Sequence, residues 1–258
     1  MDWVKAIFLG LLQGLTEFLP ISSSGHLAIA KGLFGISTND IAFEIVVHAA
    51  TALAVIVVFW QDIVKLYNGV KKFEYNSETK YVLMLIVSMI PVAIVGIFFK
   101  DQVEAIFATG PLNIGCALLV TAMILAVSQL YSPRHGHRMS YKRAILMGIA
   151  QAVAVIPGIS RSGATIATGL MSGARKEEVA RFSFLMVLVP ILGEAFLELV
   201  SGGLAHSTTG IVPLALGFAS AYFSGVFACR VMVEFVKNAS LGWFAIYCTI
   251  VGILCLFV

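Results

Sequence analysis

The sequence has little charge. Only 12% of its 258 residues are charged and 59% are hydrophobic, whereas a typical soluble domain is about a quarter charged. This shortage excludes an ordinary soluble domain and predicts an integral membrane protein. The formal net charge of +3 is too small to indicate a nucleic-acid partner.

Several chemical motifs are missing as well. The four cysteines lie in apolar runs without CxxC spacing or a nearby histidine, so we expect small buried residues rather than a zinc site. No GxxxxGK[ST] loop is present, which argues against a nucleotide-driven machine. The apolar N-terminal run contains Gln13 and Glu17 and no small-residue cleavage site, so we interpret it as mature structure rather than a signal peptide.

Six apolar runs are long enough, or nearly so, to cross a bilayer as helices. They lie at about 45–60, 82–98, 112–130, 182–199, 212–230 and 243–258. The connections 61–81 and 131–143 are rich in Lys and Arg, whereas 200–211 contains neither. The positive-inside rule therefore places the first two connections in the cytoplasm. Each half then has three spans, an odd number, so the two halves have opposite orientations.

One motif occurs twice. Residues 5–25 read KAIFLGLLQGLTEFLPISSSG and residues 143–163 read RAILMGIAQAVAVIPGISRSG, identical at eight of twenty-one aligned positions. Each apolar stretch is too short to span before its proline, Pro20 or Pro157, and proline favours a break in a helix. We expect a re-entrant helix–loop–helix in each half, with the two serine-rich tips meeting inside the membrane.

The predicted fold is therefore an all-α integral membrane protein with an inverted-topology repeat. We expect a single membrane domain, 1–258, made of repeats at about 1–130 and 139–258. Each half should contain about three transmembrane helices and one re-entrant helix–loop–helix.

Arg161 is the most informative polar residue. An arginine at membrane depth costs about 2.5–3.5 kcal/mol on insertion scales, so it usually has a partner or a function. Its fork of donors suits a phosphate or carboxylate. The alternative is a structural ion pair with Glu17, which shares a helical face with Gln13. Glu17 could also be a general base, a metal ligand or the proton-relay group of a transporter.

The two tips carry hydroxyl groups. Ser22, Ser23 and Ser24 precede Gly25 and His26. Such serines often bond only local backbone, but a serine beside a histidine can also be an activated nucleophile, and spacing alone leaves both open. The second tip offers an anion cradle at a helix N-terminus, made of Ser160, Arg161, Ser162, Gly163 and Thr165.

At these residues the chain resembles the integral-membrane undecaprenyl-diphosphate phosphatases linked to bacitracin resistance. The first family motif, Glu or Gln, three residues, then Glu, matches Gln13 and Glu17, and a serine-rich stretch with histidine matches 22–26. The second motif, PGxSRSxxT, matches 157–165. Some members have Glu where this chain has Gln13, which leaves one fewer carboxylate for a metal.

The resemblance implies hydrolysis of undecaprenyl diphosphate to undecaprenyl phosphate and phosphate, which recycles the lipid carrier for peptidoglycan synthesis and confers resistance to bacitracin, a competitor for the substrate. It implies a multi-pass protein of the bacterial plasma membrane, surrounded by lipid, with a site open to the outer face. It also implies stimulation by a divalent cation, Mg²⁺ or Ca²⁺, and leaves a homodimer open.

Our hypothesis is phosphoryl transfer where the tips meet, with four catalytic residues. Arg161 clamps the diphosphate, Ser23 is the nucleophile unless water attacks directly, and His26 is its base or the acid for the leaving group. Glu17 orients His26, activates water or binds the metal. The expected substrate-binding residues are Gln13, Ser22, Ser24, Gly158, Ser160, Ser162, Gly163 and Thr165. The rival class is a lipid transporter or flippase, which would bind the headgroup without cutting it.

Overall fold

The computed structural model describes residues 1–36, 42–99, 102, 110–133, 136–200, 209–238 and 240–257, and within 194–200 only the side chain of residue 196. Every regular element in this part of the chain is a helix, apart from one isolated bridge between His137 and Ala174. The helices are α1 (Trp3–Phe18), α2 (Ser23–Leu33), α3 (Ala42–Val58), α4 (Trp60–Val70), α5 (Ser77–Phe98), α7 (Pro111–Tyr131), α8 (Tyr141–Val153), α9 (Arg161–Met171), α10 (Lys176–Val200), α11 (Ile211–Asn238) and α12 (Gly242–Cys255).

These helices confirm an all-α membrane protein. By length and composition, α5, α7 and α11 can each cross a membrane, and α3 with α4 makes a fourth span if that pair, bent by 72°, counts as one. The predicted run 45–60 is therefore interrupted at its end by a bend. The other two predicted runs fall in α10, which begins with charged residues, and in α12, which has 14 residues.

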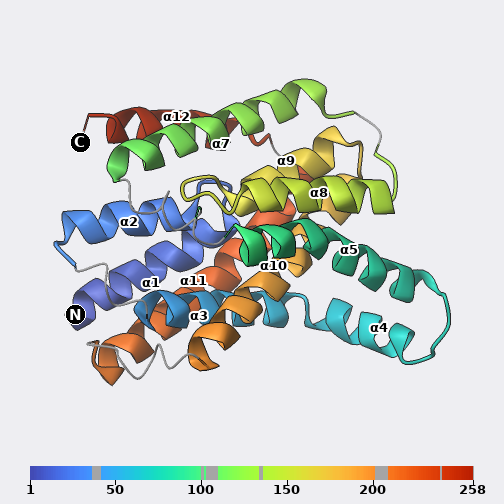
Figure 1. Ribbon diagram of the computed structural model, residues 1–258, viewed down its shortest axis with the longest axis horizontal. Helices are drawn as coiled ribbons and strands as arrows, with labels where there is room; N and C mark the ends of the chain where they lie inside the picture. The colour runs from blue at the N-terminus through green and yellow to red at the C-terminus, as the bar shows by residue number, and fades with distance from the viewer. Residues whose placement is uncertain are drawn as a thin grey trace.

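Each copy of the repeated motif forms a helical hairpin that breaks near its proline. α1 ends at Phe18 and α8 at Val153, just before Pro20 and Pro157. The following helices begin with equivalent serine caps: Ser22 accepts from the backbone N–H of Gly25 and Ser160 from that of Gly163. In Figure 1, α1 and α8 run in from opposite ends of the molecule, and their loops meet near its middle.

The two hairpins also pack in equivalent ways. α1 lies against α11, α8 lies against α5, and α7 lies against α12. The aligned glycines Gly10 and Gly148 permit the first two contacts, because a Cβ there would lie 2.4 Å from the Gly217 carbonyl oxygen and 2.3 Å from that of Ser88. Small residues allow helices to approach closely in membranes. In each of the three pairs, a helix of one half packs against a helix of the other half, which is typical of an inverted repeat. The division into 1–130 and 139–258 stays a prediction.

Substitution of Gly148 should test the close helix contact. We expect Gly148→Ala to lower the free energy of unfolding by about 1–3 kcal/mol, because the added methyl group forces α8 away from the α5 backbone. Thermal unfolding of the detergent-purified protein measures this. Gly96→Ala, where a Cβ meets nothing within 4 Å, is the matched control and should unfold at or above the wild-type temperature. Equal unfolding temperatures for the two variants would contradict this packing.

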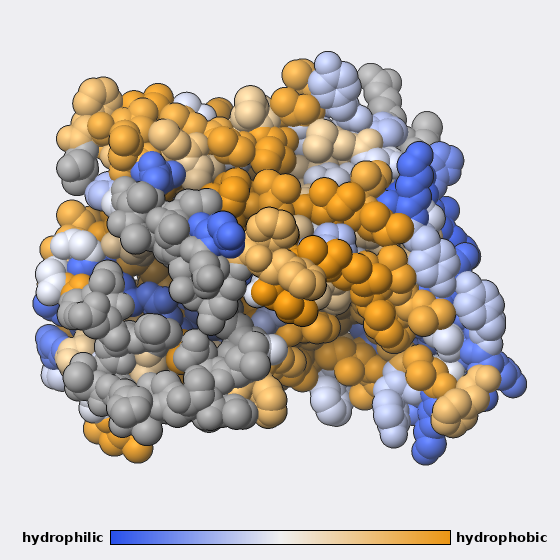
Figure 2. Space-filling view, in the orientation of Figure 1, coloured by the Kyte–Doolittle hydropathy of each residue, from blue (hydrophilic) through white to orange (hydrophobic). Residues whose placement is uncertain are grey.

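The surface has an apolar band and a polar end. Figure 2 shows hydrophobic side chains across the middle of the visible face and hydrophilic ones along one end. At that end Figure 1 places the α4–α5 turn and the connection from α7 to α8, which carry the exposed cations Lys71, Lys72 and Arg138, and Lys142 follows in the first turn of α8. The positive-inside rule predicts that this end is cytoplasmic.

Candidate active site

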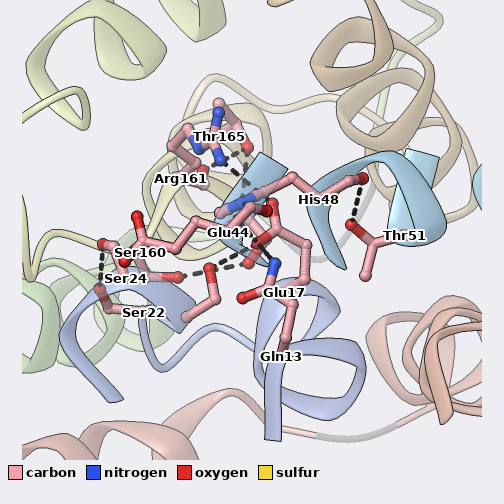
Figure 3. Close-up of polar contacts among 12 residues, drawn as sticks. Gln13, Glu17, Ser22, Ser24, Glu44, His48, Thr51, Ser160, Arg161 and Thr165 are labelled. Atoms are coloured by element: carbon pink, nitrogen blue, oxygen red, sulfur yellow. Dashed lines mark hydrogen bonds and ion pairs between the residues drawn. The ribbon is translucent and has the colours of Figure 1, made fainter. Parts of the chain in front are cut away.

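Glu17 is the centre of a buried polar cluster where the two tips meet (Figure 3). Its side chain, 4% exposed, lies in the last turn of α1. One carboxylate oxygen, Oε2, accepts from Ser23 Oγ at 2.5 Å and from Gln13 Nε2 at 2.8 Å. The other, Oε1, accepts from Arg161 Nη2 at 3.2 Å. The structure thus brings together four predicted site residues, and these donors offset the desolvation of a buried carboxylate.

Ser23 and Arg161 occupy aligned positions of the duplicated motif, and both contact the same carboxylate. Among the described residues, the guanidinium hydrogen-bonds only Glu17, and the Arg161 side chain is 23% exposed. The structural ion pair considered from the sequence therefore forms. Because arginine has five N–H donors, most of the fork can still receive an anion.

Local hydrogen bonds hold the second tip in shape. The backbone N–H of Ser160 donates to Thr121 Oγ1 at 3.0 Å, and Ser162 Oγ donates to the Leu19 carbonyl of the first tip at 3.1 Å. Thr165 Oγ1 donates to the Arg161 carbonyl at 2.8 Å. Gly158 has φ of +88°, which only glycine adopts readily. Of the predicted residues of this tip, Arg161 contacts Glu17 and Ser162 contacts the first tip at Leu19, whereas Ser160 is held by Thr121 on α7.

The three serines of the first tip differ in their contacts. Ser22 has φ of +70° and caps α2, and its Oγ lies 3.4 Å from that of Ser24. These two serines bond locally, as one of the two sequence interpretations expected. The hydroxyl of Ser23 instead points across to Glu17 on another helix. The geometry therefore distinguishes Ser23 as the serine with a base.

His26 does not take the place expected from the sequence. Its Nδ1 donates to the Ser22 carbonyl at 2.8 Å, so Nε2 can accept from the Tyr247 hydroxyl, also at 2.8 Å. The two rings stack at 5.6 Å between centroids. Among the described residues, no hydrogen bond or ion pair joins His26 to Ser23 or Glu17. The bond to the carbonyl four residues earlier turns the ring towards α12, so its expected role as the base for Ser23 is not favoured here.

His48 is the histidine that faces the site. Its Nε2 lies 3.8 Å from Glu17 Oε2, and its Nδ1 donates to the Glu44 carbonyl at 2.8 Å. The carboxylate of Glu44 pairs with Lys31. The sequence places Glu44 and His48 on one helical face without assigning them a role. Two ionisable residues one turn apart in an apolar run were the available signal, because such residues are usually functional.

The side chains around Glu17 do not fit a protein-ligated divalent cation. No group of three His, Cys, Asp or Glu residues suited to a metal occurs in the described ranges. In the part of the chain that the structure describes, Glu17 is the one carboxylate bonded to both tips, and its oxygens accept from Ser23, Gln13 and the cation Arg161. A magnesium ion carried by a phosphate ligand would not need such a site.

Comparison with known proteins agrees with these motifs. The family model described as "Bacitracin resistance protein BacA" matches residues 6–254. A protein of Bacteroides fragilis named undecaprenyl-diphosphatase is 52% identical, over 98% of this chain and 97% of that protein. Proteins of the same name from Christiangramia forsetii and Halothermothrix orenii are 45% and 38% identical, over the same shares of the chains. The chain belongs to the BacA bacitracin resistance family.

Proposed function

We propose that this protein hydrolyses undecaprenyl diphosphate to undecaprenyl phosphate and inorganic phosphate. The observation that supports it best is the 2.5 Å hydrogen bond from the Ser23 hydroxyl to Glu17, whose other oxygen pairs with Arg161. A nucleophile, a base and a phosphate-binding cation are thus within one buried cluster. The relatives named undecaprenyl-diphosphatase supply the substrate, which the geometry alone would not identify.

In the first step Ser23 Oγ attacks the terminal phosphorus, and the bond from that phosphorus to the bridging oxygen breaks. Glu17 accepts the hydroxyl proton and passes it to the departing undecaprenyl phosphate. In the second step water attacks the phosphoserine, its proton goes to Glu17, and the P–Oγ bond breaks as Oγ takes that proton back. Inorganic phosphate and free Ser23 result, so atoms and protons balance over the cycle.

Arg161 supplies positive charge where negative charge develops. Phosphoryl transfer depends mainly on positioning and electrostatic stabilisation. The guanidinium uses one N–H on Glu17, so its remaining donors can bind two oxygens of the terminal phosphate. The positive end of α9, which begins at Arg161, adds to this attraction.

His48, rather than His26, is the imidazole that we place beside Glu17 in this reaction. Its Nε2 faces the same Glu17 oxygen that accepts from Ser23. Because Nδ1 donates to a backbone carbonyl, the ring is held in one orientation, with Nε2 towards the carboxylate. His48 is therefore placed to exchange a proton with Glu17.

The activity would take place at the outer face of the bacterial plasma membrane. The positive-inside rule assigns the end near the α4–α5 turn to the cytoplasm, and α1 and α2 enter from the opposite end (Figure 1). The headgroup would reach the tips from that outer end, with its lipid tail among the apolar helices. Recycling of the carrier for peptidoglycan synthesis, and resistance to bacitracin, follow from this reaction.

The test is phosphate release from undecaprenyl diphosphate by the detergent-purified protein, with and without EDTA. We expect wild type to release phosphate and Glu17→Ala to release none, with His137→Gln, an exposed histidine, as an active control. Loss of release with EDTA, restored by Mg²⁺ or Ca²⁺, would show that a cation accompanies the substrate. Tight binding without release by wild type would instead favour a lipid carrier.

A further inference from the structure

A small cavity is lined in part by Glu17 and Arg161. Its volume is about 10 Å³. The rest of the lining includes the polar residues Gln151, Thr165 and Ser183 and the rings of Phe18 and Phe184. A space of this size corresponds to about one water molecule and is too small for a phosphate group.

Gln151 is the unexplained member of this wall. The side chain is completely buried, and its Oε1 has no hydrogen-bond partner among the described residues. Its Nε2 contacts only Met89 Sδ, at 3.9 Å, and sulfur is a weak acceptor. A buried polar group without a partner costs about 1–3 kcal/mol, so an unsatisfied amide at a cavity wall requires an explanation.

The repeat indicates why the amide nitrogen of Gln151 has no strong acceptor. Gln151 aligns with Gln13, whose Nε2 donates to Glu17 four residues later. In the second copy the corresponding residue is Val155, which offers no acceptor. The second glutamine therefore lacks the carboxylate that accepts from the amide nitrogen of the first, and its side chain lines the cavity.

The polar groups of the wall suit one water molecule. A buried water needs two to four polar partners. The Gln151 amide provides one, the hydroxyls of Thr165 and Ser183, 2.6 Å apart, provide a second, and the Glu17–Arg161 pair provides a third. Water both donates and accepts, so it can satisfy the amide without a further protein group.

We propose that this cavity binds a single water held by Gln151, and that this water hydrolyses the phosphoserine formed on Ser23. The inference rests on the proposed function. In this step the water oxygen forms the new bond to phosphorus and gives a proton to Glu17, which adjoins the cavity. The P–Oγ bond breaks and Oγ takes that proton. Gln151 is a positioning residue, because it acts through the water.

The experiment separates the two chemical steps. Purified full-length protein is mixed with undecaprenyl diphosphate labelled in the terminal phosphate, and both products are followed by rapid quench. Gln151→Leu keeps the bulk of the side chain but removes the amide. It should release one equivalent of undecaprenyl phosphate at the wild-type rate, then release phosphate about 10²-fold more slowly. Mass spectrometry should find the missing phosphate on Ser23.

Control variants separate positioning from folding. Gln129→Leu removes an exposed amide that bonds Ser240 and should release both products as wild type does. Gln151→Asn withdraws the amide by one methylene, so phosphoserine should accumulate to an intermediate level in a protein that unfolds near the wild-type temperature. Gln151→Asn therefore tests the water site even if Gln151→Leu does not fold.

Two outcomes would overturn the inference, and they differ from failure of the proposed function. Phosphate release by both Gln151 variants at the wild-type rate would refute the water site, as would an equal fall of both products without phosphoserine. In both of these outcomes, rapid quench of the wild-type protein still yields phosphoserine, so the proposed nucleophile stands although the water site fails. If instead Ser23→Ala turns over normally and no variant forms phosphoserine, the proposed nucleophile fails and the water assignment fails with it.

Discussion

Ser23→Ala should lower the rate of phosphate release by roughly 10⁴-fold or more, the scale seen when a catalytic nucleophile is removed. The Ser23 hydroxyl is the one group that donates to Glu17 Oε2 from the neighbouring helix α2, so the variant loses the attacking atom and leaves the ion pair with Arg161 intact. The measurement is single-turnover release of phosphate from undecaprenyl diphosphate by purified protein.

Two further variants show whether the loss of phosphate release in Ser23→Ala is due to loss of the nucleophile. Ser128→Ala removes a buried hydroxyl that bonds only a carbonyl of its own helix, α7, and should keep full activity. Glu17→Gln removes the base but keeps Ser23, and should be as inactive as Ser23→Ala. If Ser23→Ala remained active while Glu17→Gln did not, water activated by Glu17 would be the nucleophile.

Arg161→Lys is expected to lower kcat/KM for phosphate release by about 10²–10³-fold, the cost of one lost donor to a developing charge. Lysine keeps the positive charge but loses the planar fork that binds two oxygens at once. The unfolding temperature should change little, because the ammonium group can still pair with Glu17. Steady-state kinetics and thermal unfolding of the same preparation test both statements.

The matched control for this substitution is Arg175→Lys, at an exposed arginine between α9 and α10. It should leave kcat/KM unchanged. Near-normal turnover by Arg161→Lys would show that charge alone is sufficient and would refute a bidentate contact. A large fall in unfolding temperature would show that the pair with Glu17 is mainly structural, the alternative considered from the sequence.

The backbone of the site was predictable because the signals for it are local. Proline and the serine caps act within one turn of chain, so the breaks after Phe18 and Val153 follow from the sequence. The duplication then predicts that the tips meet. A buried arginine and a buried glutamate in those tips require a partner each, so the contact between Glu17 and Arg161 was foreseeable.

The directions of the side chains were not predictable in the same way. His26 follows Ser23 by one turn, but a hydroxyl on α12 and a carbonyl of its own helix hold its ring away from Glu17. His48 reaches Glu17 only because α3 packs against α1. Likewise, the bend between α3 and α4 accompanies an ion pair from Asp62 to Arg181 on α10, at 3.1 Å. Such contacts join residues far apart in sequence.

Because positions 23 and 161 are equivalent in the repeat, the difference between Ser23 and Arg161 makes a nearly symmetrical pair of tips suited to an asymmetrical substrate. Two identical tips facing each other would present either two serines or two arginines to the ligand. The first pair would lack a phosphate-binding cation, and the second would lack a nucleophile. Undecaprenyl diphosphate has one phosphate bonded to lipid and one free. The differences between Ser23 and Arg161 and between Glu17 and Val155 make the paired tips unequal. In the proposed reaction, the terminal phosphate is therefore bound by Arg161 and attacked by Ser23.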